Sequence, residues 1–277
     1  MPTSTFRIIS VDPAPSKDST VFDSKDGFLK LDAFTLDQHL KKARRSDQPV
    51  LLAWDAPLTG PWSLDSIPVK EKTDNKRDFN PFYQRYIEKD LGAKFSSGKT
   101  AIYEKSKKVV TVLGYAGCSH WAISRAILEL PRVGRYCLPN SSLPFALLTK
   151  DERPSSSTKG NYVVETHPAL AMAMLFKDNH KAELALQRYK SAKKQERLGA
   201  IETLKESLKT KLSDFPDTFV VIDDYDQMEA VNAIDDDDHL DAFVGFLLAR
   251  HWITSSKRLL VEIRGNLEEG AILLPVG

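Results

Sequence analysis

The feature that most constrains the fold is a mostly apolar run near the start of the chain that ends in an acidic residue. Phe6-Arg-Ile-Ile-Ser-Val-Asp12 is followed at once by Pro13-Ala-Pro15. A run of β-branched and aromatic residues over about four to eight positions predicts a buried strand. A carboxylate at the carboxyl end of such a strand lies where open α/β sheets bind their ligands. The alternative is that Asp12 is a turn residue before the prolines, so other parts of the chain have to decide between the two.

The next residues predict two more strands, a helix and a fourth strand. Ser19–Phe22 and Phe28–Phe34 are strand candidates separated by an Asp-Gly turn, which is a hairpin signal. Leu36–Arg45 predicts a short amphipathic helix. Val50-Leu-Leu-Ala-Trp-Asp55 is a second apolar run that ends in an acid. The predicted order is therefore β-β-β-α-β, with acids at the ends of the first and fourth strands, and it resembles the opening of the ribonuclease H-like fold.

Between about residues 60 and 160 the strand signals are sparse, and basic and aromatic residues occur together. Pro81–Leu91 and Ser119–Leu130 predict helices there. We interpret this region as a largely helical insertion that forms a cap or substrate wall within a single domain spanning residues 1–277. Cations that follow phosphates and rings that stack on bases suit single-stranded nucleic acid. An ordinary solvated helical face with core aromatics explains the same pattern, and both interpretations stay open.

A third short strand with an acidic end is predicted after the insertion. Asn161-Tyr-Val-Val-Glu165 precedes a helix over Ala169–Phe176, with a proline in its first turn. Glu165 is therefore a candidate for the same edge of the sheet as Asp12 and Asp55. A glutamate just before a helix can instead stabilise the helix dipole, and this alternative stays open.

A long helix is predicted from about Ala182 to Leu212, because leucine and isoleucine residues recur there at helical spacing. Its other face is basic. We expect contacts to the phosphates of a nucleic acid from this face and from a lysine that follows the first strand: Lys17, Lys190, Lys193 and Arg197. A solvent-exposed helical face explains the same cluster.

The last informative stretch, Asp235–Arg250, is a group of acids followed by an apolar helix. Acids in a first helical turn are stabilised by the helix dipole and need no further explanation. Asp238 and Asp241, however, are three positions apart and share a face. Asp241 also lies within the apolar part, where a carboxylate is costly to bury unless it is paired or bound to a cation.

Five acidic residues are thus candidates for one catalytic site: Asp12, Asp55, Glu165, Asp238 and Asp241. Carboxylate oxygens suit Mg²⁺ or Mn²⁺, and no set of cysteines and histidines indicates zinc. Carboxylates this close repel one another unless divalent ions neutralise them. Two ions roughly 4 Å apart would activate a water and stabilise the leaving oxygen in phosphodiester hydrolysis.

Five motifs, in this order, carry a resemblance to a known family: Val11-Asp12, Trp54-Asp55-Ala-Pro-Leu58, Glu165-Thr-His-Pro168, Asp238-His-Leu-Asp241-Ala242 and Glu269-Gly-Ala-Ile-Leu-Leu-Pro275. They resemble the uncharacterised family of predicted ribonuclease H-like nucleases. The Asp-x-x-Asp-Ala element is also similar to that of Holliday-junction resolvases, which belong to the same superfamily.

The resemblance implies metal ligation by Asp12, Asp55 and Asp241, with Asp238 beside them and Glu165 as a further ligand. One departure matters. Ribonuclease H proper has a glutamate on its first helix, whereas the predicted first helix here offers one aspartate and basic residues. Either Glu165 substitutes for that glutamate, or the site holds fewer metal ions.

Two other classes of function stay open. A catalytically silent module would keep the sheet and bind nucleic acid or protein through the insertion. Actin-like sugar kinases and chaperone ATPases share a similar core with an acid on its first strand. They normally have two copies of that core and glycine-rich phosphate turns, whereas Pro13-Ala-Pro15 stands at the corresponding place here.

The composition of the chain says more about where in the cell the protein is located than about the reaction it performs. The net charge of +1 excludes neither an acidic nor a polyanionic partner, and only Cys118 and Cys137 are present. No apolar run approaches the roughly 20 residues needed to span a bilayer. The first six residues lack the features of a signal peptide. We therefore expect a reduced, cytoplasmic protein. The expectation that it acts on DNA or RNA comes from the acidic residues and the resemblance.

Overall fold

The structure is a computed structural model that describes residues 6–14, 16–56, 58, 123–124, 126–129, 144–148, 153–154, 160–213, 227–254, 260–266 and 270–276. Most of the predicted insertion, including Pro81–Leu91, lies outside these residues. Of the helix predicted at Ser119–Leu130, the structure describes helical residues at 123, 124 and 126–128. The interpretation of the insertion as a cap or substrate wall remains a prediction.

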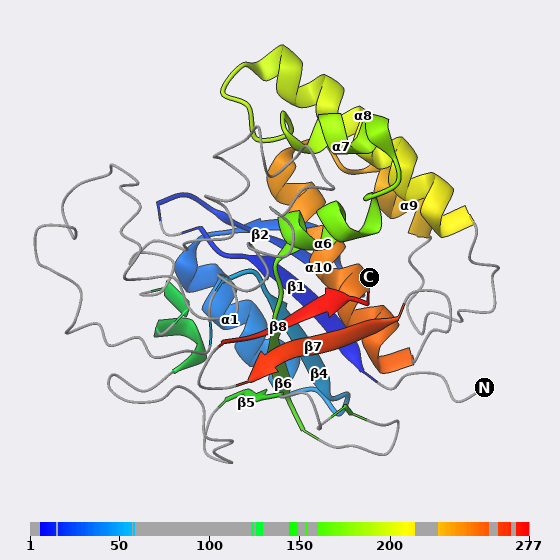
Figure 1. Ribbon diagram of the computed structural model, residues 1–277. Coiled ribbons are helices and arrows are strands. Elements are labelled where there is room, and N and C mark those ends of the chain that lie inside the picture. Colours follow the sequence, from blue (N-terminus) through cyan, green and yellow to red (C-terminus); the bar gives the residue numbers. More distant parts are fainter. Residues whose placement is uncertain are drawn as a thin grey trace, which may run out of the picture.

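The centre of the fold is a mixed six-stranded sheet with the order β3-β2-β1-β4-β6-β5 (Figure 1). Its strands are β1 (Arg7–Asp12), β2 (Ser19–Asp23), β3 (Gly27–Leu31), β4 (Val50–Trp54), β5 (Ala146–Leu147) and β6 (Tyr162–Glu165). β1, β4, β6 and β5 are mutually parallel, whereas β2 is antiparallel to both β1 and β3. The predicted mixed α/β class is confirmed, and β5 is a strand that the sequence did not predict.

The first helix begins earlier than its hydrophobic pattern predicts. Helix α1 spans Ala33–Arg44, so the strand predicted over Phe28–Phe34 ends at Leu31 instead. The cause is a helix cap: the Asp32 side chain accepts a hydrogen bond of 2.7 Å from the backbone N–H of Thr35. Phe34, which the sequence pattern assigns to the strand, is 71% exposed on the first turn of the helix.

After β6 the structure describes five further helices: α6 (Pro168–Leu175), α7 (His180–Leu186), α8 (Lys194–Ser213), α9 (Gln227–Asn232) and α10 (Asp237–Thr254). The long helix predicted from Ala182 to Leu212 is therefore two helices. The chain turns between them, where the backbone N–H groups of Arg188 and Tyr189 both bond to the carbonyl of Ala185. This break matters because the turn carries a lysine into the candidate site. The strand candidate Phe219–Ile222 lies outside the described residues.

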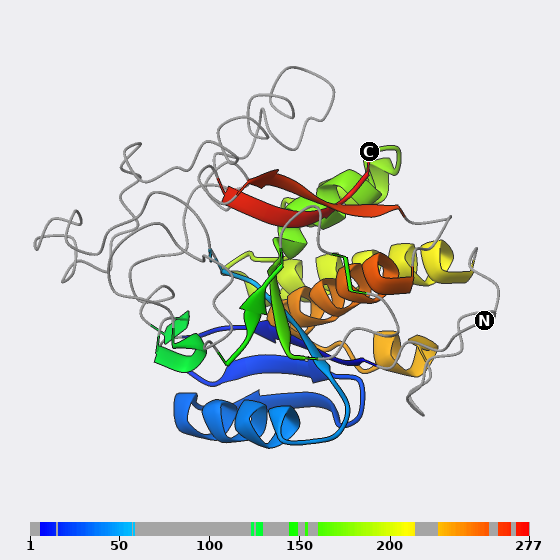
Figure 2. The same cartoon turned by 90° about the horizontal axis from the view of Figure 1, so that it is seen from below.

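Two hydrophobic clusters cover the two faces of the sheet. α1 packs on one face, and α10 packs on the other against β1, β2 and β4 (Figure 2). The ring of Phe22 on β2 is central to the α10 face. Its centroid lies 4.7 Å from that of Phe28, 5.1 Å from that of Phe243 and 4.7 Å from that of Phe246. The edge-on contacts with Phe243 and Phe246 hold α10 over β2.

A separate antiparallel hairpin, β7 (Val261–Asn266) and β8 (Gly270–Pro275), follows α10. It contacts α6 and α10, and an isolated parallel bridge joins Leu273 to Thr166, just beyond β6. The sequence did not predict this hairpin. Among the described residues, no helix combines the length and apolar character needed to cross a membrane.

Candidate metal and catalytic site

Strand register brings Asp12 and Asp55 together. β1 and β4 are parallel, Val11 pairs with Trp54, and the backbone N–H of Asp55 donates a 2.9 Å hydrogen bond to the carbonyl of Val11. Asp12 follows Val11 as the last residue of β1, and Asp55 follows Trp54 directly after β4. Residues in register on neighbouring strands point to the same face of a sheet. Both carboxylates therefore leave the carboxyl edge of the sheet on the face that α10 covers, and both are partly buried.

A close contact between α10 and β1 brings Asp241 to the same place. A Cβ atom on Gly245 would lie 2.4 Å from Oγ of Ser10 and 3.4 Å from Oγ1 of Thr166, so the helix backbone lies directly on the sheet. Asp241 is one helical turn before Gly245, and Asp12 is two residues beyond Ser10 on the same face of the strand. Asp241 is 1% exposed.

The electrostatics show that these carboxyl groups act on one another. Desolvation raises the pKa of Asp12 to about 8; the nearby charge of Lys190 opposes this rise, whereas Asp241 and Asp238 add to it. Desolvation, followed by the charges of Asp12 and Asp241, raises the pKa of Asp55 well above its usual value. Desolvation also raises the pKa of Asp241. The structure thus gathers three of the five predicted acids, from β1, β4 and α10.

Lys190 lies on the turn between α7 and α8, and its side chain reaches into this group. Its Nζ is 2.6 Å from Oδ2 of Asp241, and the hydroxyl of Tyr189 donates a 3.3 Å hydrogen bond to Oδ1. Burial by itself would lower the pKa of Lys190, but the charges of Asp241, Tyr189 and Asp12 raise it well above its usual value. Lys190 was predicted to contact phosphate on a helical face, whereas here it pairs with an acid of the site.

Glu165 is near the group but points differently. It pairs with Trp54 in the sheet, so strand alternation places its side chain on the face opposite to Asp12 and Asp55. It is 2% exposed, and its Oε2 accepts a 2.7 Å hydrogen bond from the backbone N–H of Leu58. Its charge still adds to the rise in the pKa of Asp55. Glu165 therefore holds the backbone that follows β4, and its metal ligation stays a prediction.

Asp238 lies at the rim of the group and pairs with lysines. Its side chain is 18% exposed and forms an ion pair with Lys17. Nζ of Lys30 lies 3.0 Å from Oδ2 of Asp236 and 3.9 Å from Oδ2 of Asp238. The acidic start of α10 is thus neutralised by residues from the first three strands and their loops.

Two other residues that the sequence predicts to bind phosphate, Arg197 and Lys193, lie in different surroundings. Nε of Arg197 lies 3.7 Å from Oδ1 of Asp237, which places Arg197 beside the start of α10. Lys193, which directly precedes α8, instead pairs at 2.8 Å with Glu196 of that helix, and its side chain is 78% exposed. Arg197 is therefore beside the candidate site, whereas Lys193 is part of a local surface pair.

Within the described part of the chain, two groups of three side chains have ligand atoms that all lie within 4.8 Å of one another, and neither contains an acid that the sequence predicted for the site: Asp23 with Asp26 and His39, and Asp235 with Asp236 and His239. In the second group Asp235 is exposed, Asp236 and His239 are partly buried, and Asp236 already pairs with Lys30. Since exposed acids commonly group without an ion, this second group supports no site on its own.

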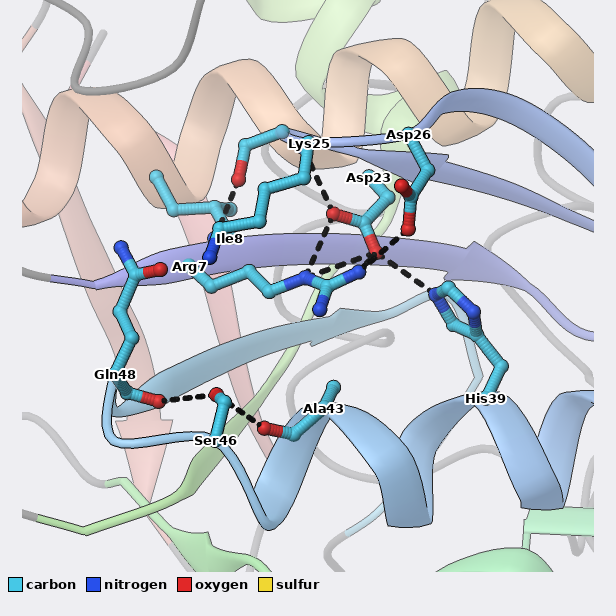
Figure 3. A network of polar contacts seen from close by, with 10 residues as sticks. Arg7, Ile8, Asp23, Lys25, Asp26, His39, Ala43, Ser46 and Gln48 are labelled. Carbon is cyan, nitrogen blue, oxygen red and sulfur yellow. Dashed lines mark hydrogen bonds and ion pairs between the residues drawn. The ribbon is translucent and has the colours of Figure 1, made fainter.

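The first group contains a built-in cation, as Figure 3 shows. Nη2 of Arg7 lies 2.6 Å from Oδ2 of Asp23 and 2.7 Å from Oδ2 of Asp26, and Nε2 of His39 lies 2.8 Å from the same oxygen of Asp23. Burial by itself would raise the pKa of Asp23, but hydrogen bonds from His39 and Arg7 lower it. A metal ion here would have to displace the guanidinium, so we interpret the group as structural. Its sequence signal is Arg7 itself, a cation within an apolar run that needs a buried partner.

Comparisons of the chain with protein-family models, with curated proteins and with solved structures found no match. The chemistry of this chain therefore has to be inferred from its own residues. Asp12, Asp55, Asp241 and Lys190 form the group at the carboxyl edge of the sheet, and we take this group as the candidate functional site.

Proposed function

We propose that the chain has a ribonuclease H-like fold and hydrolyses phosphodiester bonds of DNA or RNA with Mg²⁺ or Mn²⁺. The observed order of β1, β2, β3, α1 and β4 supports the fold, because it is the β-β-β-α-β order of the resemblance. The positions of Asp12 and Asp55 at the ends of the first and fourth strands support the chemistry.

The observation that carries this proposal is an excess of carboxylates over cations in the group. Asp12, Asp55 and Asp241 face the ammonium group of Lys190, and the charge of Lys17, which also acts on Asp12, is matched by its own partner Asp238. Removing carboxylates from water is costly unless cations neutralise them, and the raised pKa of Asp12 expresses that cost. A divalent ion would supply the missing charge. The ligand atoms on offer are carboxylate oxygens, which fit Mg²⁺ or Mn²⁺.

Different residues of the candidate site would have different roles in this reaction. Asp12, Asp55 and Asp241 would hold the metal, which polarises a phosphate oxygen and lowers the pKa of a bound water when it is present. Tyr189 and Lys190 orient the Asp241 carboxylate through its two oxygens. Two cations that pair with the acidic start of α10 would contact the phosphates of the substrate: Lys17 and Arg197.

Calorimetric titration with Mn²⁺ tests the proposal, using the wild type, Asp12→Asn and Asp241→Asn. Saturable binding in the wild type and its loss in both variants would place the two acids in one metal site. Asp26→Asn is the matched control, because Asp26 belongs to the group around Arg7 and its substitution should leave this binding unchanged. Nuclease assays on single-stranded, hybrid and branched substrates would then follow.

A catalytically silent binding module is the second candidate, and one observation favours it. Asp241 already has an ammonium partner in Lys190, so the fold neutralises part of the site without a metal. Absence of Mn²⁺ binding in the wild type, with and without an oligonucleotide present, would exclude the metal-dependent nuclease. Oligonucleotide binding that persists under those conditions would support the binding module.

A further inference from the structure

The position of Lys190 bears on how many metal ions the site takes, an inference that rests on the proposed metal-dependent function. Its Nζ lies 2.6 Å from the buried carboxylate of Asp241, and its charge also acts on Asp12 and Asp55, the other ligands of the two-ion scheme. An ammonium group is a compact positive charge with three hydrogen-bond donors. We propose that Lys190 takes the place of one of the two expected cations, so that this site binds one divalent ion beside the lysine.

Charge balance supports a single ion. With Asp12, Asp55 and Asp241 all ionised, one ammonium and one divalent cation neutralise them. A second divalent ion would leave the group with a net positive charge and would place that ion against the ammonium of Lys190. Like charges held this close in a partly buried site repel strongly.

The supply of ligands supports the same conclusion. The two-ion scheme draws on Glu165 as a further ligand, but its side chain starts on the opposite face of the sheet and binds the backbone N–H of Leu58. Asp238 is already paired with Lys17 at the rim. Helix α1 offers only Asp37 as an acid, and Asp37 pairs with Lys41 at 2.7 Å. Because these acids have other partners, the ligand that a second ion would need is Oδ2 of Asp241, which Lys190 occupies.

The approach of Lys190 to the site indicates what its charge does there. The side chain is 39% exposed, whereas Asp241 is 1% exposed, so the ammonium reaches a buried acid from the surface. Nζ also lies 5.5 Å from the ring centroid of Tyr189, a second contact that holds the lysine in place. A phosphate that enters from the same surface meets a fixed positive charge. This charge would stabilise the phosphate as the second ion otherwise does.

The test is the number of Mn²⁺ ions bound per chain, measured by calorimetry and by the electron paramagnetic resonance signal of free Mn²⁺. We expect one ion in the wild type and two in Lys190→Met, where the cation is lost but most of the stem volume is kept. Lys190→Arg keeps the charge and should bind one ion. Lys193→Met is the matched control, because Lys193 lies on the same turn but pairs with the surface Glu196. It should also bind one.

The outcomes separate this inference from the proposed function. Two ions in the wild type would overturn the inference and leave the metal-dependent function standing, and this result does not depend on any variant being able to fold. One ion in both the wild type and Lys190→Met would also overturn it, since the lysine would then be only a partner for Asp241. Absence of Mn²⁺ binding in every protein, with and without an oligonucleotide, would overturn both.

Discussion

Replacing Gly245 by alanine tests the contact that sets α10 against the sheet. An added Cβ would lie 2.4 Å from Oγ of Ser10, whereas ordinary van der Waals contact begins at 3.4 Å. The helix and strand would therefore have to separate by up to about 1 Å, or the serine side chain would have to rotate into an already packed core.

The size of the effect follows from two opposing contributions. Alanine is favoured over glycine within a helix by about 0.5–1 kcal/mol. Inserting a methyl group into a well-packed core costs about 1–3 kcal/mol. We therefore expect Gly245→Ala to lower the free energy of unfolding by about 1–2 kcal/mol, with the packing cost exceeding the gain in helix propensity.

Urea unfolding monitored by circular dichroism measures this change, and two comparisons sharpen it. Gly199 is also within a helix, but a Cβ there would meet nothing within 4 Å. Gly199→Ala should therefore raise the free energy of unfolding by about 0.5–1 kcal/mol. The double variant Ser10→Ala with Gly245→Ala removes the closest atom and leaves the Cβ of residue 10 at 3.6 Å. In the Ser10→Ala background, the alanine at position 245 should cost little.

One result would refute this reasoning. If Gly245→Ala stabilised the protein as much as Gly199→Ala, α10 would not lie on β1 at the distance described. Because Asp241 is placed by that same contact, its position beside Asp12 would then lose its structural basis.

Three further predictions concern single acids. Asp23→Asn should lower the free energy of unfolding by about 3 kcal/mol, because Arg7 loses its buried acidic partner and keeps the half-exposed Asp26, whereas Asp26→Asn should cost less than about 1 kcal/mol; urea unfolding compares the two. The folded-state pKa of Asp12 is about 8, above the usual 3.8, so its ionisation opposes folding. Without divalent ions, stability should therefore fall as the pH rises from about 4 to about 8, by roughly 2 kcal/mol because the group is partly exposed, and thermal melts of Asp12→Asn should show a smaller slope. Asp32→Ala removes the cap of α1 and should cost about 1 kcal/mol, whereas Asp37→Ala, which removes a surface ion pair, should cost under about 0.5 kcal/mol in the same unfolding assay.

The sequence predicts the parts of the site that depend on local patterns. Asp12 and Asp55 end apolar runs, and because parallel strands in register share an edge, their proximity follows from the strands alone. Asp241 is recognisable as a carboxylate within an apolar helix. The mixed α/β class can be predicted in the same way, because each of the first strands and the first helix is recognisable from the hydrophobic pattern of its own short segment.

The contacts that the sequence did not predict are set by tertiary structure. Lys190 lies within a helical pattern, and only the break between α7 and α8 turns it toward Asp241. The face of the sheet on which the Glu165 side chain lies depends on the register of β6 with β4, because a change of one residue in that register moves the side chain to the other face. The acids that Arg7 contacts come from a neighbouring strand and a turn, and His39 of α1 joins the group through Asp23, so periodicity along one segment could not identify them.

The placement of α10 on β1 and β2 has a consequence for synthesis on the ribosome. The strands that α10 covers are made first, and the helix that covers them is the last of the described helices to emerge. Until then, the apolar face around Phe22 has no helix to pack against and is open to aggregation or to chaperones. Because Asp12 and Asp241 meet only after that docking, the candidate site is completed by a late step of folding. A nascent chain stalled before α10 would carry the strands but neither the buried face nor the site.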